Sequence, residues 1–463
     1  MQKIKFDWKN GKITLFWPDH PLVMAGDAIL ENVVQELEKG TDTEIISNDI
    51  VQKTGEDIRE VREFVQHIHD ALKESVFLPP KDNKSSASEL KPDTGELAMA
   101  TLNLTRKCNL KCSHCYAGGN KSPKEREMTV AEIKSAVIKL SELIQHKPRL
   151  FIISGGEPTL EKEKLKAAVS TARENGLKVR LNTNGYFMDD DLSKFLSDNQ
   201  VLTQVSLDGI NQETNALLRG RADAFDAAIT AIKRLVNSHC RTRISFTVHS
   251  ANVNQIPDML NMAEQLGVEQ FTTSSLVRIG NATEGTIKPV EFSHEFSIMY
   301  DAVKDSPERQ KMTKSTLLAE TITAIRAGIH FVYCGTGYST CCIDSSGDVY
   351  PCINMLREGY KTFNINSDNY KWEWENSDVL RKLRRTNVDE LNDTCPKCEF
   401  RYFCGGYCRG ETLECGGTIT SPYARCKARK RGLIQILKII AESPKIYNFY
   451  KDQDPVMGIL HRE

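Results

Sequence analysis

The sequence predicts an α/β protein whose central part is a parallel sheet, open or partly closed as a barrel, between a small N-terminal unit and a cysteine-rich C-terminal region. Between about residues 100 and 277, six β-rich runs alternate with amphipathic helices. A polar stretch with prolines and serines precedes this alternation, and ten of the 14 cysteines follow it. A length of 463 residues also suggests roughly three units.

Composition and charge exclude several classes of protein. The apolar share is 40% without glycine and about 46% with the 28 glycines, which is that of an ordinary globular chain, and 61 basic residues balance 62 acidic ones. A net charge of −1 supplies no overall field to hold a nucleic-acid backbone or an anionic membrane. The sequence contains no apolar run of membrane-spanning length and no signal-peptide pattern at its start. We therefore expect a soluble, cytoplasmic protein without nucleic-acid or membrane partners.

The first 80 residues predict a compact unit of a hairpin and three helices. Two alternating runs, KIKFDW and KITLFW, flank Asn10-Gly11, a dipeptide that favours a tight hairpin turn. Helical periodicity follows in AILENVVQELEKG, EIISNDIVQKTG and DIREVREFVQHIHDALKE. Residues 81–98 have the composition of a flexible linker.

Residues 99–320 predict the parallel sheet. Its six strands are expected in these runs: TLNLT, RLFIIS, KVRLNT, QVSLD, RISFTVHS and EQFTTSSLV. Helices are expected between them near residues 129–144, 160–175, 189–198, 223–237 and 254–266. Reactive groups of such a fold gather at the carboxyl ends of its strands. Polar clusters follow the first four strands, at residues 108–115, 155–157, 182–185 and 206–209, and we expect them to face one site.

The first of these clusters reads CNLKCSHC and supplies three thiols, from Cys108, Cys112 and Cys115. A structural zinc ion normally takes four ligands, whereas an iron–sulfur cube held by three thiolates leaves one iron open. A zinc site completed by His114 or by a remote ligand remains the alternative.

This spacing resembles that of the radical S-adenosylmethionine (radical SAM) enzymes, in which an aromatic residue, here His114, precedes the last cysteine. The resemblance covers residues 100 to about 285 and includes the motif Gly155-Gly156-Glu157 after the second strand. It implies a partial (β/α)6 TIM-like barrel with a 4Fe-4S cluster whose open iron chelates S-adenosylmethionine (SAM). One electron then cleaves SAM to a 5′-deoxyadenosyl radical, which abstracts a hydrogen atom.

The residue types around the motif suit SAM. Gly155 and Gly156 let the backbone approach the methionine moiety, and Glu157 can bind its ammonium group. Further candidates for contacts with the ribose or the carboxylate are Asn184, Ser206 and either Arg219 or Arg221. Polar residues at strand ends also commonly cap the next helix, so both interpretations stay open for these residues.

The C-terminal region, residues 321–463, carries a second cysteine pattern and ends in an apolar helix. Its spacing is Cys-x12-Gly-x4-Cys, a gap, Cys-x2-Cys-x5-Cys-x3-Cys and a final cysteine. This resembles the seven-cysteine SPASM extension, which holds two auxiliary 4Fe-4S clusters. The resemblance implies one ligand set of Cys334, Cys352 and Cys408 and a second set of Cys395, Cys398, Cys404 and Cys426.

The first auxiliary cluster would have an open iron unless Cys341 or Cys342 supplies a fourth thiolate. A zinc ribbon is the alternative for the whole region. Two cysteines outside the pattern, Cys240 and Cys415, are expected to be small buried hydrophobic residues, although Cys415 is close enough in sequence to serve as a transient ligand.

The N-terminal unit resembles the PqqD-like precursor-recognition element, a winged-helix-like fold that binds the leader of a ribosomally made peptide. A hairpin edge can accept an extended peptide as an added strand. A DNA-binding winged helix is not favoured, because the third helix mixes charges of both signs: Asp57, Arg59, Glu60, Arg62 and Glu63.

Together these features resemble the radical SAM/SPASM peptide maturases of the sactisynthase and ranthipeptide-synthase type. The resemblance implies three 4Fe-4S clusters, a precursor peptide bound through its leader, and an electron donor such as flavodoxin or ferredoxin. We expect a thioether between a cysteine sulfur and a carbon atom. A sulfatase-maturing enzyme is disfavoured, because Ile353 follows Cys352 where that branch has an aspartate.

Other chemistries on the same core remain open: carbon–carbon cross-linking, epimerisation, or the decarboxylation of mycofactocin maturation. A zinc-stabilised binding protein without redox chemistry is the non-enzymatic alternative. His249 lies at the end of the fifth strand. We favour the interpretation that it fills the barrel over the alternative that it contacts substrate.

Overall fold

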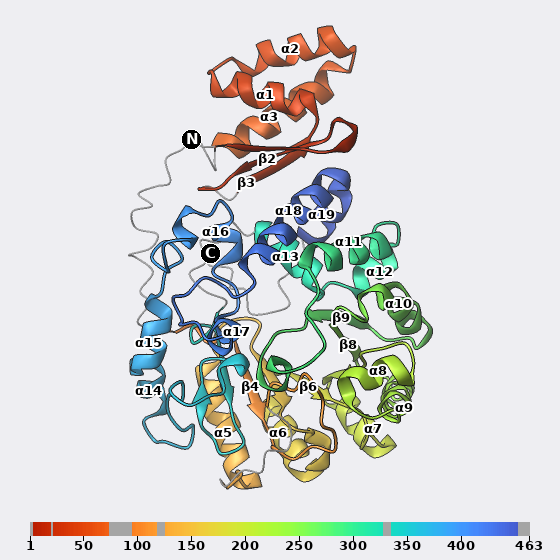
Figure 1. Ribbon diagram of the computed structural model, residues 1–463, viewed down its shortest axis with the longest axis vertical. Helices are drawn as coiled ribbons and strands as arrows, with labels where there is room; N and C mark the ends of the chain where they lie inside the picture. The colour runs from red at the N-terminus through yellow and green to blue at the C-terminus, as the bar shows by residue number, and fades with distance from the viewer. Residues whose placement is uncertain (1–2, 20–21, 74–94, 118–125, 327–334, 452–463) are drawn as a thin grey trace.

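The computed structural model describes residues 3–19, 22–73, 95–117, 126–326 and 335–451. Figure 1 shows the N-terminal unit at one end of the long axis, next to the C-terminal helices and away from most of the central sheet. Within the described ranges no helix is both long and apolar enough to cross a membrane.

The N-terminal unit is a three-stranded antiparallel sheet with three helices. Its strands are β1 (Ile4–Asp7), β2 (Ile13–Trp17) and β3 (Leu22–Gly26), in the order β1-β2-β3. The helices are α1 (Ala28–Glu38), α2 (Thr43–Thr54) and α3 (Ile58–Leu72). The predicted hairpin and helices are confirmed, whereas β3 was missed because its sequence, LVMAG, shows no alternation.

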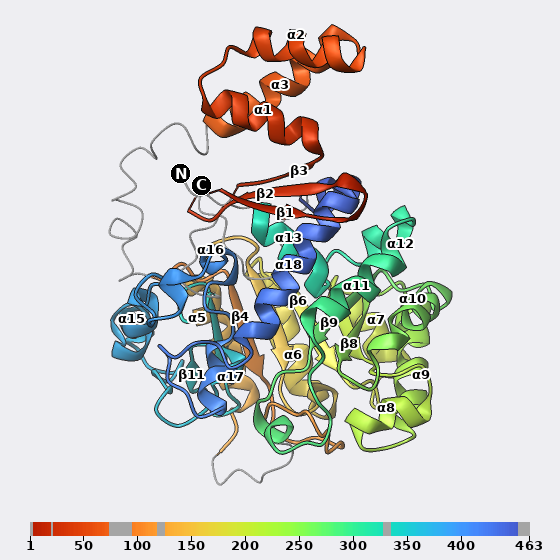
Figure 2. The same cartoon turned by 45° about the horizontal axis from the view of Figure 1, so that its top comes forward.

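Strand β2 has two buried faces. Ile13, Leu15 and Trp17 lie in the core of the N-terminal unit. Phe16 points the other way and belongs to the main core, where it contacts Phe400 and Phe403 with ring centroids 5.4 and 5.2 Å apart. The unit is therefore docked on the C-terminal region, as Figure 2 also shows.

The central sheet contains the six predicted parallel strands in chain order. They are β4 (Met99–Asn103), β5 (Leu150–Ser154), β6 (Lys178–Thr183), β7 (Leu202–Ser206), β8 (Thr242–Val248) and β9 (Gln270–Ser275). Its helices are α5 (Val130–Leu143), α6 (Lys162–Glu174), α7 (Asp190–Asp198), α8 (Gln212–Arg219), α9 (Ala224–Asn237) and α10 (Ile256–Gln265). The partial barrel is confirmed, and α8 is an addition to the predicted helices.

Two strands of the C-terminal region extend this sheet beyond β4. Strand β10 (Thr340–Ile343) pairs parallel with β4, and β11 (Val349–Tyr350) pairs antiparallel with β10. The order of the described strands is β11-β10-β4-β5-β6-β7-β8-β9, so the sheet is open. Leu97 and Ala98, at the end of the predicted linker, are fully buried.

The two faces of the sheet differ in polarity. Ala100 and Leu102 of β4 lie in the main core with the helices that cover the sheet. Thr101 and Asn103 alternate with them and lie on the opposite, inner face, as do Asn182 of β6 and Ser206 of β7. The inner face is therefore polar and faces the interior of the partial barrel.

The remaining helices lie at the edge of the barrel and in the C-terminal region. They are α11 (Phe292–Val303), α12 (Pro307–Met312), α13 (Leu317–Arg326), α14 (Tyr370–Asn376), α15 (Asp378–Arg385), α16 (Arg401–Cys404), α17 (Arg409–Glu414), α18 (Cys426–Glu442) and α19 (Pro444–Lys451). The predicted apolar helix is part of α18. A Cβ on its Gly432 would lie 2.6 Å from the Phe292 Cβ of α11, so a glycine permits this close helix packing.

Candidate functional site

The loop after β4 places Cys108, Cys112 and Cys115 at the carboxyl end of the sheet. The segment after β9 holds this loop: the Asn281 backbone N–H donates to the Cys115 carbonyl oxygen at 3.1 Å, and Asn281 Nδ2 donates to the Cys112 carbonyl oxygen at 3.0 Å. The first and last strands of the barrel thus contribute to one site.

Gly155-Gly156-Glu157 packs directly on the cysteine loop. The Gly156 N–H donates to the Thr105 carbonyl oxygen at 2.7 Å, and the Glu157 N–H donates to the Lys107 carbonyl oxygen at 2.8 Å. A Cβ on Gly156 would lie 2.1 Å from the Lys107 oxygen. The motif and the cysteines therefore share one site, and the glycines are required for contact between the two loops. Their approach to the methionine moiety stays a prediction.

The buried Glu157 carboxylate joins the loops after β5 and β6. Its Oε1 accepts hydrogen bonds from the Thr159 N–H, the Thr159 hydroxyl and the Thr183 hydroxyl, at 3.0, 2.5 and 2.7 Å. Its Oε2 accepts from the Asn184 N–H at 2.7 Å. Burial raises the pKa of Glu157, and these bonds oppose the shift. A bond to the SAM ammonium group stays a prediction.

The other sequence candidates divide between the site and the surface. Asn184 Nδ2 donates to Asn109 Oδ1 of the cysteine loop at 2.9 Å, and Ser206 ends β7 on the inner face. Arg221 is exposed and pairs with Asp223. Of the two arginine candidates, Arg219 lies at the cysteine loop and Arg221 does not.

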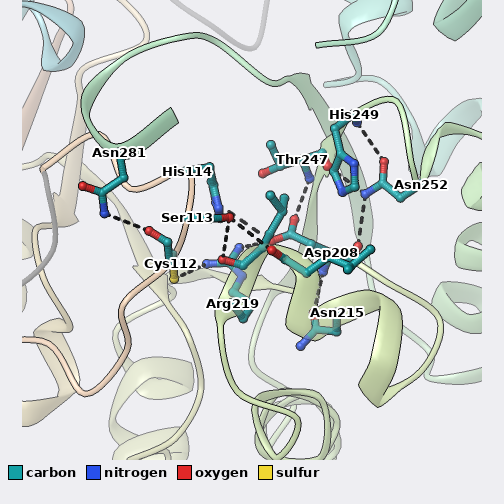
Figure 3. Close-up of polar contacts among 12 residues, drawn as sticks. Cys112, Ser113, His114, Asp208, Asn215, Arg219, Thr247, His249, Asn252 and Asn281 are labelled. Atoms are coloured by element: carbon teal, nitrogen blue, oxygen red, sulfur yellow. Dashed lines mark hydrogen bonds and ion pairs between the residues drawn. The ribbon is translucent and has the colours of Figure 1, made fainter. Parts of the chain in front are cut away.

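Figure 3 shows how Arg219 is held. One guanidinium nitrogen pairs with Asp208 Oδ2 at 2.5 Å, and another lies 3.8 Å from Cys112 Sγ. Asp208 is fully buried, and its Oδ1 accepts from the Thr247 N–H at 2.7 Å. Sequence reasoning noted the SLDG cluster but did not assign a role to Asp208. The signal was an acidic residue at a strand end, nine residues before the start of the basic LLRGR segment.

Two histidines flank Asp208. His114 Nε2 lies 4.0 Å from Asp208 Oδ2, and burial lowers the pKa of His114 to about 4. His249 is fully buried; its Nδ1 accepts from the Ala251 N–H at 3.1 Å. This agrees with the interpretation of His249 as a histidine that fills the barrel. A cavity beside His114 is lined by Ser113, Leu217, Leu218, Leu276, Ala282, Gly285, Thr286 and Ile287.

The cysteine loop suits an iron–sulfur cluster. The Leu110 N–H lies 3.4 Å from Cys108 Sγ, and the Arg219 guanidinium lies 3.8 Å from Cys112 Sγ. Both groups are hydrogen-bond donors that would stabilise thiolates. Among the described residues, no three His, Cys, Asp or Glu side chains converge as ligands of one ion. The thiolates of a cube do not need to converge in this way, because each binds a different iron.

The C-terminal region brings the second cysteine set together. Burial, with a smaller contribution from the neighbouring thiols of Cys426, Cys398 and Cys395, raises the pKa of the Cys404 thiol to about 11. Asn392 Nδ2 donates to Cys395 Sγ at 3.3 Å. The four predicted ligands of the second auxiliary cluster are therefore neighbours.

Four further cysteines, Cys240, Cys334, Cys408 and Cys415, differ in their surroundings or in whether the structure describes them. Cys334 lies outside the described residues. Cys408 Sγ accepts from the Glu411 N–H at 3.4 Å, and Cys240 is buried as expected. Cys415 is exposed, so its expected burial is wrong. It directly follows the short helix α17, whose buried residues precede it.

Comparison with known families and structures agrees with this geometry. Residues 102–263 match the radical SAM superfamily, and residues 334–399 match the iron-sulfur cluster-binding SPASM domain. The AdoMet-dependent heme synthase of Methanosarcina barkeri is 28% identical over 68% of this chain and 91% of its own length. The mycofactocin maturase MftC of Mycolicibacterium smegmatis is 27% identical over 70% of this chain and 81% of its own length.

The fold is similar to that of Streptococcus suis SuiB, solved with bound S-adenosylmethionine. The TM-score is 0.60 at 15% identity, over 92% of this chain and 98% of SuiB. The cysteine loop, the packed Gly155-Gly156-Glu157 motif and the two matched domains agree with one another. The chain is therefore a radical SAM enzyme with a SPASM domain, and its cofactors are SAM and 4Fe-4S clusters.

Proposed function

We propose that this enzyme installs an oxidative cross-link, a thioether from a cysteine sulfur to a carbon atom, in a ribosomally made precursor peptide. The observation that carries the proposal is the docking of the N-terminal unit on the segment between Cys398 and Cys404, through Phe16. A unit that binds the leader would then be fixed relative to both cysteine regions. A structure of SuiB with its precursor peptide, SuiA, shows that a protein of similar fold binds such a substrate.

In this proposal the cysteine loop and its neighbours bind the cofactor. Cys108, Cys112 and Cys115 hold one cluster, and Glu157, Asn184, Ser206, Arg219 and His114 orient SAM. Bound there, SAM would supply a 5′-deoxyadenosyl radical that removes one hydrogen atom from the peptide. The cysteine thiol would release a proton as the sulfur–carbon bond forms, and the remaining electron would pass to an iron–sulfur cluster. Asp208 fixes the Arg219 guanidinium beside Cys112, where its positive charge can also bind a carboxylate.

The same proposal assigns two auxiliary clusters to the C-terminal cysteines. Cys334, Cys352 and Cys408 hold the first, and Cys395, Cys398, Cys404 and Cys426 hold the second. A low-potential donor such as flavodoxin or ferredoxin supplies the electron that cleaves SAM. The domains divide as residues 1–80 for leader recognition, 81–98 for the linker, 99–320 for the radical SAM core and 321–463 for the SPASM region.

The second candidate function is another peptide chemistry on the same core, with decarboxylation first and carbon–carbon cross-linking or epimerisation after it. The observation that favours it is the similarity to mycofactocin maturases along 70% of the chain.

Product masses separate these candidates. The enzyme, purified without oxygen, is incubated with SAM, dithionite and a synthetic cysteine-rich precursor peptide encoded near its gene. Thioether formation predicts a loss of two hydrogens and one cysteine that no longer reacts with iodoacetamide. A product that lacks carbon dioxide, or an unchanged mass with inverted stereochemistry, would contradict the thioether assignment. Without peptide, 5′-deoxyadenosine is still expected from SAM, and a zinc-stabilised binding protein would form none.

A further inference from the structure

Exposed apolar side chains gather around the cysteine loop of the SAM site. Among the described residues, seven large hydrophobic side chains are exposed. Three of them, Leu160, Phe187 and Leu217, are 37%, 37% and 44% exposed and belong to segments that contact this loop. The other four are distributed over the N-terminal unit, α5 and α14: Ile45, Phe64, Ile138 and Trp372. Single exposed apolar residues are ordinary, whereas a group of them on one surface indicates a partner.

Leu217 and Leu160 lie on two sides of the cysteine loop. The Ser113 hydroxyl of this loop donates to the Leu217 carbonyl oxygen at 3.1 Å. Leu160 directly precedes Glu161, whose carboxylate accepts from Lys107 Nζ at 2.6 Å. The helix α8 and the segment after β5 therefore both meet the loop through residues that are next to an exposed leucine.

Phe187 reaches the same loop through the segment after β6. Asn184 Nδ2 donates to Asn109 Oδ1 of the loop at 2.9 Å, and Asn184 Oδ1 accepts from the Tyr186 N–H at 3.1 Å. Phe187 is the next residue. The guanidinium of Arg221 lies over the Tyr186 ring, 5.0 Å from its centroid. Three separate segments thus surround one loop with apolar and basic side chains.

The surface around the loop is basic. Residues 105–117 carry three basic residues and no acidic residue: Arg106, Lys107 and Lys111. Lys107, Lys111 and Arg221 are exposed. Lys111 lies beside the end of α8, because a Cβ on Gly220 would be 3.3 Å from the Lys111 carbonyl oxygen. Lys107 and Arg221 each pair with one carboxylate, so Lys111 makes the surface positive. We call the surface formed by these residues the cluster rim: Leu160, Phe187, Leu217, Lys107, Lys111 and Arg221.

The cluster rim lies where a radical SAM enzyme takes up its electron. Lys107 directly precedes Cys108, and Lys111 directly precedes Cys112. The second auxiliary region offers no such surface. Its Phe400 is 1% exposed beneath the N-terminal unit, and among the described residues 373–450 no large apolar side chain is exposed. A carrier that needs an apolar and basic surface therefore finds one at the SAM site.

We propose that the cluster rim is the docking surface of an acidic flavodoxin, which reduces the SAM cluster directly and not through the auxiliary clusters. Flavodoxins are small acidic electron carriers, so their charge complements Lys107, Lys111 and Arg221, and opposite charges guide such an encounter. The flavin hydroquinone loses the one electron that the cluster gains, and the anionic hydroquinone needs to release no proton. This inference rests on the part of the proposed function that names a low-potential donor, and is independent of the bond formed in the peptide.

The test measures binding of purified, oxidised flavodoxin to the iron-loaded full chain by calorimetry. Lys111→Glu reverses a charge next to Cys112. Lys427→Glu is the matched control, because Lys427 is also exposed and directly follows Cys426 of the second auxiliary region. Phe187→Ser tests the apolar part of the rim independently. Iron content and 5′-deoxyadenosine formation with dithionite show that each variant is folded and loaded.

We expect Lys111→Glu to weaken flavodoxin binding about tenfold at low salt. The difference should vanish at about 1 M salt, where the Debye length is about 3 Å. Phe187→Ser should weaken binding at both salt concentrations, and Lys427→Glu should bind like the wild type. Formation of 5′-deoxyadenosine with reduced flavodoxin should fall in the two rim variants, while the rate with dithionite stays unchanged.

Three results would overturn the docking surface and leave the proposed function intact. They are a wild-type protein that does not bind flavodoxin, rim variants that bind it like the wild type, and a loss of binding in Lys427→Glu alone. A wild-type protein that forms no 5′-deoxyadenosine with dithionite would overturn the proposed function and this inference with it.

Discussion

Phe16 of the N-terminal sheet stacks on Phe400 of the cluster-binding region, with ring centroids 5.4 Å apart and ring planes 12° apart. Phe400 lies between Cys398 and Cys404, two predicted ligands of the second auxiliary cluster. Both rings are almost completely buried. The N-terminal unit therefore shields this part of the chain from solvent.

Replacement of Phe16 by alanine should loosen this contact. Loss of a buried phenylalanine costs about 3–5 kcal/mol, and Phe16 contributes to the main core. We expect a lower melting temperature and faster loss of iron in air. Phe64→Ala is the control, because Phe64 is 42% exposed on α3. Equal iron loss from both variants would contradict a shielding role for Phe16.

Replacement of Asp208 by asparagine should weaken SAM binding through Arg219. The change removes the charge that holds the guanidinium beside Cys112. We expect the dissociation constant for SAM to rise roughly tenfold, or about 1.4 kcal/mol, by calorimetry on the iron-loaded protein. Arg221→Ala is the control and should leave SAM affinity unchanged. Unaltered affinity in Asp208→Asn would show that Arg219 does not bind the cofactor.

Replacement of Gly156 by alanine should separate the two loops of the SAM site. The added Cβ would lie 2.1 Å from the Lys107 carbonyl oxygen. Because this oxygen belongs to the backbone, the clash can be relieved only by moving one of the two loops. We expect loss of SAM binding and of about four irons per chain. Gly40→Ala, after α1, meets no atom within 4 Å and strains only the local backbone at φ +83°, so it should retain both. A Gly156→Ala protein with full iron and SAM affinity would contradict the packing described here.

Stability should depend on pH through Glu295. Burial raises the pKa of this carboxyl to about 7, against the opposing effects of Ser275, Thr273, Arg425 and Arg429. Because the folded pKa exceeds the unfolded value of about 4.5, the folded state binds more protons between these values. The stabilisation is therefore present below about pH 4.5 and is lost as pH rises through about 7.

Denaturant unfolding of Glu295→Gln across pH 5 to 8 checks this effect. Glutamine cannot ionise, so the variant should lose less stability than the wild type as pH rises through this window. The same pH dependence in both proteins would contradict the raised pKa.

The β/α alternation was predictable because each parallel strand is a short apolar run followed by an amphipathic helix. The cluster-binding pattern was predictable because cysteine spacing is explicit in the sequence. β3 was missed because it is apolar throughout and directly precedes the helix cap at Asp27.

Long-range contacts account for the rest. Which side of the sheet Cys341 and Cys342 each face depends on the register of β10 with β4. These two strands are more than 200 residues apart in the sequence. The pairing of Asp208 with Arg219 likewise depends on α8, a helix of eight residues that was not among the predicted helices. Each of these residues is visible in the sequence, but the long-range contact that gives the residue its role is not.

The most direct test of the central claim is the content of iron, sulfide and zinc in protein purified without oxygen. We expect about twelve irons per chain with matching sulfide, as three cubes require. Zinc without iron would contradict the radical mechanism and both cysteine assignments.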